Sequence, residues 1–198
     1  CRDAGWDKPL WLETAEEDPG RGMARQALEA GVDLVIAAGG DGTVRCVAAE
    51  LAGTDTPLGL LPLGTGNLLA RNLDIPVDDP AAAVSAALSG TDRNIDVVHV
   101  TLDRALKGDV FLVMAGLGYD AALMGDTNDT LKDRVGWLAY IDAGIRNLPG
   151  NPVKCTIRLD GGKESSGYPR GVMGGNCGKI MGGLEIFPGA RIDDGLLD

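Results

Sequence analysis

The sequence predicts an α/β layer with a parallel sheet, followed by a β-rich second domain. Two short apolar runs in the first half each end in a glycine-rich turn and lead into a helical pattern, which is typical of a parallel sheet. After about residue 92 the pattern changes to strands joined by Gly, Asp and Pro turns. With 198 residues the chain can form one large domain or two small ones. We expect one domain at residues 1–91 and a second at 92–198.

The first half alternates helix-like and strand-like segments. The run at 32–38 is almost continuously apolar, which predicts a parallel strand covered on both faces. Glycines close several of the helical patterns, as expected at helix C-termini. The expected elements are a helix at 19–30, a strand at 32–38, a helix at 44–53, a strand at 57–63, a short helix at 68–73 and a helix at 79–90.

The second half contains one long helical stretch among strand-like segments. We expect strands at 95–102, 109–116, 152–160 and 169–174, and helices at 119–124 and 131–148. Residues 1–18 resemble the back half of a βα unit, and the last six residues resemble the start of a strand. We therefore expect the sequence to be a piece of a longer chain.

Charge and cysteine content exclude several classes of function. The formal net charge is −11, which argues against nucleic acid as a partner and against a broad electrostatic anchor on an anionic membrane. No apolar run approaches the ~18 residues that a membrane span needs. The four cysteines are widely spaced, without a C-x-x-C pair, which favours incidental thiols in a reducing compartment over a metal site or disulfide framework.

The first glycine-rich turn is Gly-Gly-Asp-Gly-Thr at residues 39–43. Glycines let the main chain approach a ligand closely, and the N–H groups of the following helix then face an anion. Thr43 is expected to cap that helix and to offer its hydroxyl to a phosphate. Asp41 would repel phosphates unless a divalent cation or a hydroxyl lies between, so it favours a metal–nucleotide complex. A plain tight turn with an N-cap Asp is the alternative.

The second turn, Gly-Thr-Gly-Asn at residues 64–67, repeats this arrangement one strand later. Thr65 offers a hydroxyl to phosphate or ribose, and Asn67 is expected to cap the short helix that follows. Alone the motif is weak. Two such turns at neighbouring strand ends predict a nucleotide lying across both.

These motifs resemble the diacylglycerol kinase catalytic domain family, which includes bacterial lipid kinases and sphingosine kinases and is related to NAD kinases. The resemblance rests on Gly-Gly-Asp-Gly-Thr, on Pro-Leu-Gly-Thr-Gly-Asn-Leu-Leu-Ala-Arg at 62–71, on Ala-Gly-Leu-Gly-Tyr-Asp-Ala at 115–121 and on Asp-Asp-Gly-Leu-Leu-Asp at 193–198. It implies an NAD kinase/diacylglycerol kinase-like α/β domain that binds ATP, followed by a β-sandwich-like domain.

The resemblance also implies roles for individual residues. Asp41 would be the catalytic residue and would organise ATP and its Mg²⁺. Asp120 is a possible substrate-side residue. A structural Mg²⁺ would be held by the Asp194 carboxylate and the carbonyls of Arg191 and Leu196, and a plain β-turn is the alternative explanation of that segment. The residues expected to bind ATP are Thr14, Gly39, Gly40, Asp41, Gly42, Thr43, Val44, Arg45, Cys46, Gly64, Thr65, Gly66 and Asn67.

Two parts of the family pattern are missing. The Asn-Pro turn of the first strand is not present, and the general base, a Glu, is expected beyond residue 198. The implied activity is transfer of the ATP γ-phosphate to a lipid hydroxyl, most simply from ATP to diacylglycerol, by a cytoplasmic protein that meets the membrane peripherally and forms a homodimer. The alternatives are an NAD kinase-like enzyme, for which the expected Asn-Glu element is not found, and a catalytically silent nucleotide-binding module.

Overall fold

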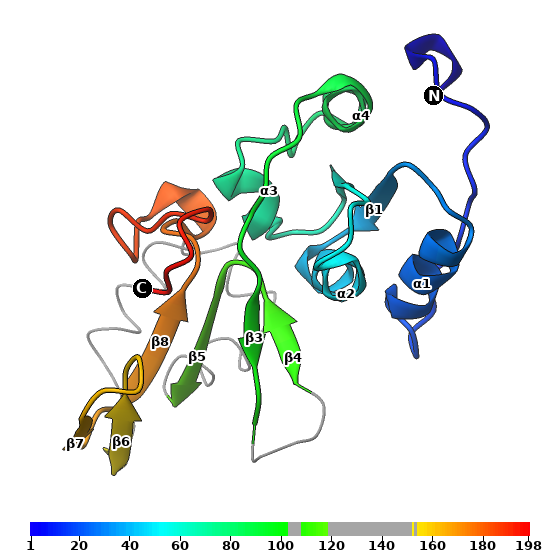
Figure 1. Ribbon diagram of the computed structural model, residues 1–198. Coiled ribbons are helices and arrows are strands. Elements are labelled where there is room, and N and C mark those ends of the chain that lie inside the picture. The colour runs from blue at the N-terminus through cyan, green and yellow to red at the C-terminus, as the bar shows by residue number, and fades with distance from the viewer. Residues whose placement is uncertain (103–107, 119–151, 153) are drawn as a thin grey trace.

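The computed structural model describes residues 1–102, 108–118, 152 and 154–198 (Figure 1). The first half is an α/β layer in which β1 and β2 pair in parallel, with Ala37 opposite Leu60 and Gly39 opposite Pro62. A short 3-10 helix, η1 (Arg2–Ala4), precedes this layer. The elements of the α/β layer are α1 (Arg21–Glu29), β1 (Val35–Gly39), α2 (Asp41–Leu51), β2 (Leu58–Pro62), α3 (Leu68–Asn72) and α4 (Pro80–Ser89).

Close packing explains two glycines of this layer, Gly59 and Gly20. A Cβ on Gly59 in β2 would lie 2.8 Å from the Ala87 Cβ of α4, so the helix can approach the strand only where a side chain is missing. Gly20 likewise admits the Val47 side chain of α2, because its Cβ would lie 2.9 Å from the Val47 Cγ2. The Asp79 carboxylate caps α4 by accepting the Ala82 N–H, one residue before a proline at the first helical position.

The strands described in the second half form antiparallel pairs. β3 (Val98–Val100) pairs with β4 (Asp109–Phe111), and β5 (Met114–Gly118) pairs with β8 (Gly171–Gly175). A hairpin joins β6 (Cys155–Arg158) to β7 (Glu164–Gly167), and a short 3-10 turn, η2 (Met181–Gly183), follows β8. Figure 1 shows these strands grouped below α3, away from β1.

The two halves share one hydrophobic core. Leu112, Cys177 and Ile192 of the second half belong to the same buried cluster as Val44 and Leu60 of the first. Burial raises the pKa of the Cys177 thiol to about 11, so this cysteine is a neutral packing residue. In the part of the chain that the structure describes, no helix has the length and apolar character needed to cross a bilayer.

The expected elements of the first half are confirmed with shifted ends. The helix expected from residue 44 already begins at Asp41, because Gly40 occupies the N-cap position with extended backbone angles. The single strand expected at 109–116 is wrong. A bend after Phe111 divides it into β4 and β5, which pair with different partners.

The remaining second-half predictions have mixed outcomes. The strands expected at 95–102, 152–160 and 169–174 are present as the shorter β3, β6 and β8. The sequence gives no strand signal for β7, because Glu164–Gly167 contains only polar and small residues. All four residues are exposed in the structure. The helices expected at 119–124 and 131–148, together with Asp120, lie outside the described residues. The boundary between residues 91 and 92 stays a prediction.

Candidate active site

The two glycine-rich turns lie against each other. Since β1 and β2 are neighbouring parallel strands, their carboxyl ends meet at one edge of the sheet, and the Leu63 N–H donates to the Gly39 carbonyl at 3.0 Å. A Cβ on Gly64 would lie 2.5 Å from the Gly40 Cα, and a Cβ on Gly40 would lie 3.3 Å from the Gly64 Cα. Neither position accepts a side chain without movement of the opposite main chain.

The N-terminus of α2 presents unpaired amides at this junction. Gly40 is the N-cap, and its carbonyl accepts the Val44 N–H in the first helical hydrogen bond. Within the described part of the chain, the N–H groups of Asp41, Gly42 and Thr43 have no acceptor. An eleven-residue helix with unpaired amides and a positive dipole end is suited to binding an anion such as phosphate.

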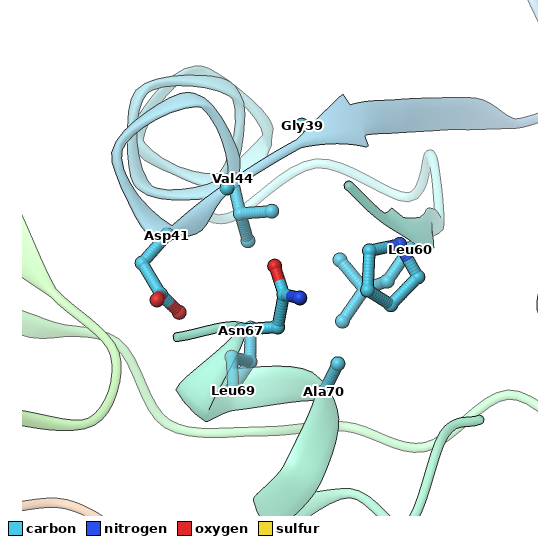
Figure 2. A pocket seen from close by; sticks show the side chains of 9 residues that line it. Gly39, Asp41, Val44, Leu60, Asn67, Leu69 and Ala70 are labelled. Carbon is cyan, nitrogen blue, oxygen red and sulfur yellow. The ribbon is translucent and has the colours of Figure 1, made fainter. Parts of the chain in front are cut away.

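Asp41 connects the two turns. Its Oδ1 accepts the Leu68 N–H at 2.7 Å, so the first residue of α2 caps the start of α3 (Figure 2). A Cβ on Gly66 would lie 2.8 Å from the Asp41 Oδ2, so a side chain there would displace this carboxylate oxygen. Oδ2 has no hydrogen-bond partner among the described residues. Oδ1 therefore stabilises the contact between α2 and α3, and Oδ2 is available to a cation or a ligand.

The capping roles expected for Asn67 and Thr43 are wrong. Asn67 is 7% exposed, and its side chain closes the second turn on itself: Oδ1 accepts the Gly64 N–H at 3.0 Å and Nδ2 donates to the Gly64 carbonyl at 2.7 Å. The Thr43 side chain packs back over Gly39, where a Cβ would lie 2.9 Å from the Thr43 Oγ1. Gly40 therefore caps α2 without a side-chain bond.

The space between the turns is too small for a nucleotide. The cavity there has a volume of about 10 Å³, roughly what one water molecule needs. Figure 2 shows Val44, Leu60 and Asn67 converging on it from α2, β2 and the second turn. Any ligand of that size bound by the two turns would have to lie on their outer side, where Gly42, Gly64 and Thr65 are exposed. The residues that line the cavity are Gly39, Gly40, Asp41, Val44, Leu60, Pro62, Asn67, Leu69 and Ala70.

The side chains of four further residues expected to bind ATP do not reach the outer side of the turns. Val44 and Cys46 are buried in the core, so only their main chains could contact a ligand. Arg45 forms an ion pair with Asp109 of β4. Thr14 is exposed in the irregular segment before α1, and it forms no hydrogen bond with either turn in the described structure.

An ion-pair network connects α1, α2 and β4. Arg25 and Arg21 both bind Glu50, and Arg21 and Arg45 both bind Asp109. Hydrogen bonding from Arg25 holds the pKa of Glu50 below its ordinary value. Burial opposes ionisation of Asp109, but the Val110 N–H and the Arg45 guanidinium outweigh it and lower its pKa. Both carboxylates are therefore ionised at neutral pH, and the network fixes α2 against the second half.

The Asp-Gly element at 193–195 forms a turn with oxygen atoms available for a cation. The Asp194 Oδ1 accepts the Leu196 N–H at 3.0 Å, leaving its Oδ2 without a described partner. The carbonyls of Arg191 and Leu196 accept no hydrogen bond from any described residue. Such an all-oxygen donor set suits Mg²⁺. In the described ranges no group of three or more His, Cys, Asp or Glu side chains could hold a metal.

Sequence reasoning missed Asp96, which joins this turn to the rest of the second half. Its Oδ2 accepts the Gly195 N–H at 2.7 Å, and its own N–H donates to the Ile192 carbonyl at 2.7 Å. The buried Asn176 also donates to the Asp96 carbonyl at 3.0 Å. The only local signal is an aspartate inside a mostly apolar strand-like run, and its partners lie 80 to 99 residues away in the sequence.

Comparison with known proteins agrees with this architecture. Residues 8–100 match the family "Diacylglycerol kinase catalytic domain", and residues 113–198 match the "YegS C-terminal NAD kinase beta sandwich-like domain". The chain is 37% identical over 199 residues to a "Probable lipid kinase YegS-like" of Pseudomonas fluorescens, covering 100% of this chain and 64% of that protein. It is 34% identical over 179 residues to the diacylglycerol kinase of Mycobacterium tuberculosis, covering 90% and 57% of the two chains.

A solved structure shows the same fold. The crystal structure of a diacylglycerol kinase from Bacillus anthracis superposes with a TM-score of 0.67 at 27% identity, covering 93% of this chain and 58% of the other. The chain thus spans less than two thirds of the relatives it matches. It belongs to the diacylglycerol kinase catalytic domain family over residues 8–100, and its β-rich second half belongs to the YegS C-terminal sandwich-like family.

Proposed function

We propose that the full-length protein is an ATP-dependent lipid kinase that transfers the ATP γ-phosphate to the hydroxyl of diacylglycerol, giving phosphatidic acid. The observation that carries this proposal is the contact between Gly40 and Gly64 beside the unpaired N-terminal amides of α2. The names of the relatives, lipid kinase and diacylglycerol kinase, support the choice of acceptor.

In this proposal the protein acts mainly by positioning and by neutralising charge. Phosphoryl transfer passes through a transition state whose charge is spread over phosphate oxygens, so main-chain donors contribute directly. The amides of Asp41, Gly42 and Thr43 would bind one part of the polyphosphate. The exposed Thr65 hydroxyl and the main chain of Gly64 would bind another part from the neighbouring turn.

Asp41 has two roles in this proposal. Its Oδ1 keeps α3 in register with α2, and its Oδ2 would hold the Mg²⁺ that accompanies ATP. When bound, that ion would neutralise negative charge on the phosphate oxygens. A second Mg²⁺ at Asp194, with the carbonyls of Arg191 and Leu196, would be structural. The family pattern predicts that the general base is a Glu beyond residue 198.

The protein would bind its lipid substrate as a peripheral protein at the cytoplasmic face of the membrane. The family resemblance implies that the active protein would be a homodimer. The experiment that tests the proposal gives the full-length protein radiolabelled ATP and three acceptors: diacylglycerol, a mixed lipid extract and NAD⁺. Labelled phosphatidic acid as the main product supports the proposal. Label on NAD⁺ alone, or on no acceptor, rejects it.

A further inference from the structure

A second cavity lies between the segment that follows α3 and the turn at 179–183 of the second half. It is an open groove of about 460 Å³, which is within the size range of small-molecule sites. None of the roles proposed above uses it. The residues that line it are Arg71, Asp74, Ile75, Pro76, Val77, Lys179, Ile180 and Gly183.

Hydrogen bonds fix the two walls of the groove relative to each other. The Asn72 side chain donates to the Lys179 carbonyl at 2.8 Å and accepts the Lys179 N–H at 3.1 Å. This amide therefore pairs with the Lys179 peptide much as a neighbouring strand would. Ile180 is buried, and its N–H donates to the Leu184 carbonyl at 2.9 Å. The groove is a preformed feature of the junction between the two halves.

The charged side chains that line the groove have a net charge of +1, whereas the net charge of the chain is −11. Neither Arg71 nor Lys179 forms an ion pair with a described residue. The Arg71 Nε donates to the Gly66 carbonyl at 2.8 Å, which leaves the terminal guanidinium nitrogens available. Asp74 is the one carboxylate on the lining. The two cations would bind an anion, and Asp74 would oppose it.

The other side chains of the groove are aliphatic. Ile75 and Val77 are partly buried against the hydrophobic core, and the exposed Pro76 lies between them in the sequence. Ile180 also lines the groove but is only 7% exposed, so it adds little further apolar surface. A free sugar phosphate or inorganic phosphate would not use this surface, and a neutral glyceride would not use the two cations. Together they match an amphiphile with an anionic head.

We propose that this groove binds the phosphomonoester head and the first acyl carbons of an acidic phospholipid, the class to which phosphatidic acid belongs. The Arg71 bond to Gly66 places one end of the groove beside the second glycine turn. A lipid phosphorylated at that turn would therefore be released next to the groove. That link to the reaction product rests on the proposed function, whereas the binding of a phosphorylated lipid rests on the groove alone.

The test measures binding to the full-length protein without ATP, by calorimetry with soluble dihexanoyl phosphatidic acid. Three further titrants separate the sources of affinity: glycerol phosphate, dihexanoyl glycerol and ATP. Phosphatidic acid should bind at least about tenfold more tightly than glycerol phosphate, because about two buried methylene groups suffice for that factor. Equal affinities would show that the aliphatic surface does not contribute, and they would overturn the proposal.

Three variants test the charges. Lys179→Gln should weaken phosphatidic acid binding by about tenfold, since a charge-assisted contact is lost. The Asn72 side chain bonds only to the main chain of Lys179, so this substitution should not change the melting temperature. Asp74→Asn should tighten binding, because it removes a like charge. Lys163→Gln is the matched control, an exposed lysine on the β6–β7 turn, and should leave the affinity within twofold.

An unchanged affinity in Lys179→Gln, or an equal loss of ATP affinity, would refute the groove as a lipid site. The two proposals also fail separately. Lys179-dependent binding without phosphate transfer to lipids would reject the kinase and keep the groove. Transfer with no phosphatidic acid binding would do the reverse.

Discussion

The double role of Asp41 can be separated by two substitutions. Asp41→Ala removes both the negative charge and the acceptor for the Leu68 N–H, whereas Asp41→Asn removes the charge and keeps an oxygen in place of Oδ1. Both variants should lose phosphate transfer to diacylglycerol, because neither has a carboxylate for the cation. Only Asp41→Ala should also lose substantial stability.

The size of the stability loss follows from the contact. A hydrogen bond to a charged group is worth about 1.5–3 kcal/mol, and loss of a helix cap costs about 0.5–2 kcal/mol. These estimates describe the same half-buried contact, so we expect about 2 kcal/mol for Asp41→Ala and less than half of that for Asp41→Asn. For a protein of about 200 residues, 1 kcal/mol shifts the melting temperature by roughly 2–4 °C. Asp41→Ala should therefore melt about 4–8 °C below the parent.

Thermal unfolding and a radiolabel transfer assay on the full-length protein measure the two effects side by side. Asp78→Asn, an exposed aspartate with no partner among the described residues, is the control and should change neither. If Asp41→Asn keeps parental activity, the electrostatic role is refuted. If Asp41→Ala melts with the parent, the cap between α2 and α3 is not a stabilising contact.

Three further outcomes follow from the geometry. Gly64→Ala places a Cβ 2.5 Å from the Gly40 Cα, so it should lower the melting temperature by at least about as much as Asp41→Ala and abolish ATP binding. Asn72→Ala removes both bonds to the Lys179 peptide, and it should cost about 1–2 kcal/mol in chemical denaturation. Asp109→Asn should cost only about 0.5–1 kcal/mol at neutral pH, because the side chain is 46% exposed. Since the folded pKa of Asp109 is lowered, its stabilisation is present above the unfolded pKa of about 4 and is lost as pH falls through the folded pKa. The difference between parent and Asp109→Asn should thus shrink in melts below about pH 4, and a difference that grows there would contradict the assigned ion pairs.

The sequence predicts the positions of the two turns because their chemistry is local. A glycine-rich turn between a parallel strand and a helix commonly binds phosphate, and neighbouring parallel strands bring their carboxyl ends together. The contact between Gly40 and Gly64 follows from those two rules and from the single crossover through α2 that links β1 to β2.

What the sequence does not predict are the long-range side-chain bonds that hold the turns. Asp41 caps a helix that starts 27 residues later, and Asp96 accepts an N–H from 99 residues away. No spacing rule encodes such pairs, because they depend on how the elements pack. Asn67 was expected to cap α3 by the usual preference for asparagine. Its left-handed backbone instead directs the amide into the Gly64 turn, which leaves the cap to Asp41.

The most direct test of the account is a crystal structure of the full-length protein with Mg²⁺ and a non-hydrolysable ATP analogue. Phosphate oxygens should lie within hydrogen-bond distance of the N–H groups at residues 41–43 and of the turn at 64–66 in the same complex. A triphosphate that contacts one turn alone, or that lies away from the N-terminus of α2, would contradict the claim that both turns form one polyphosphate site.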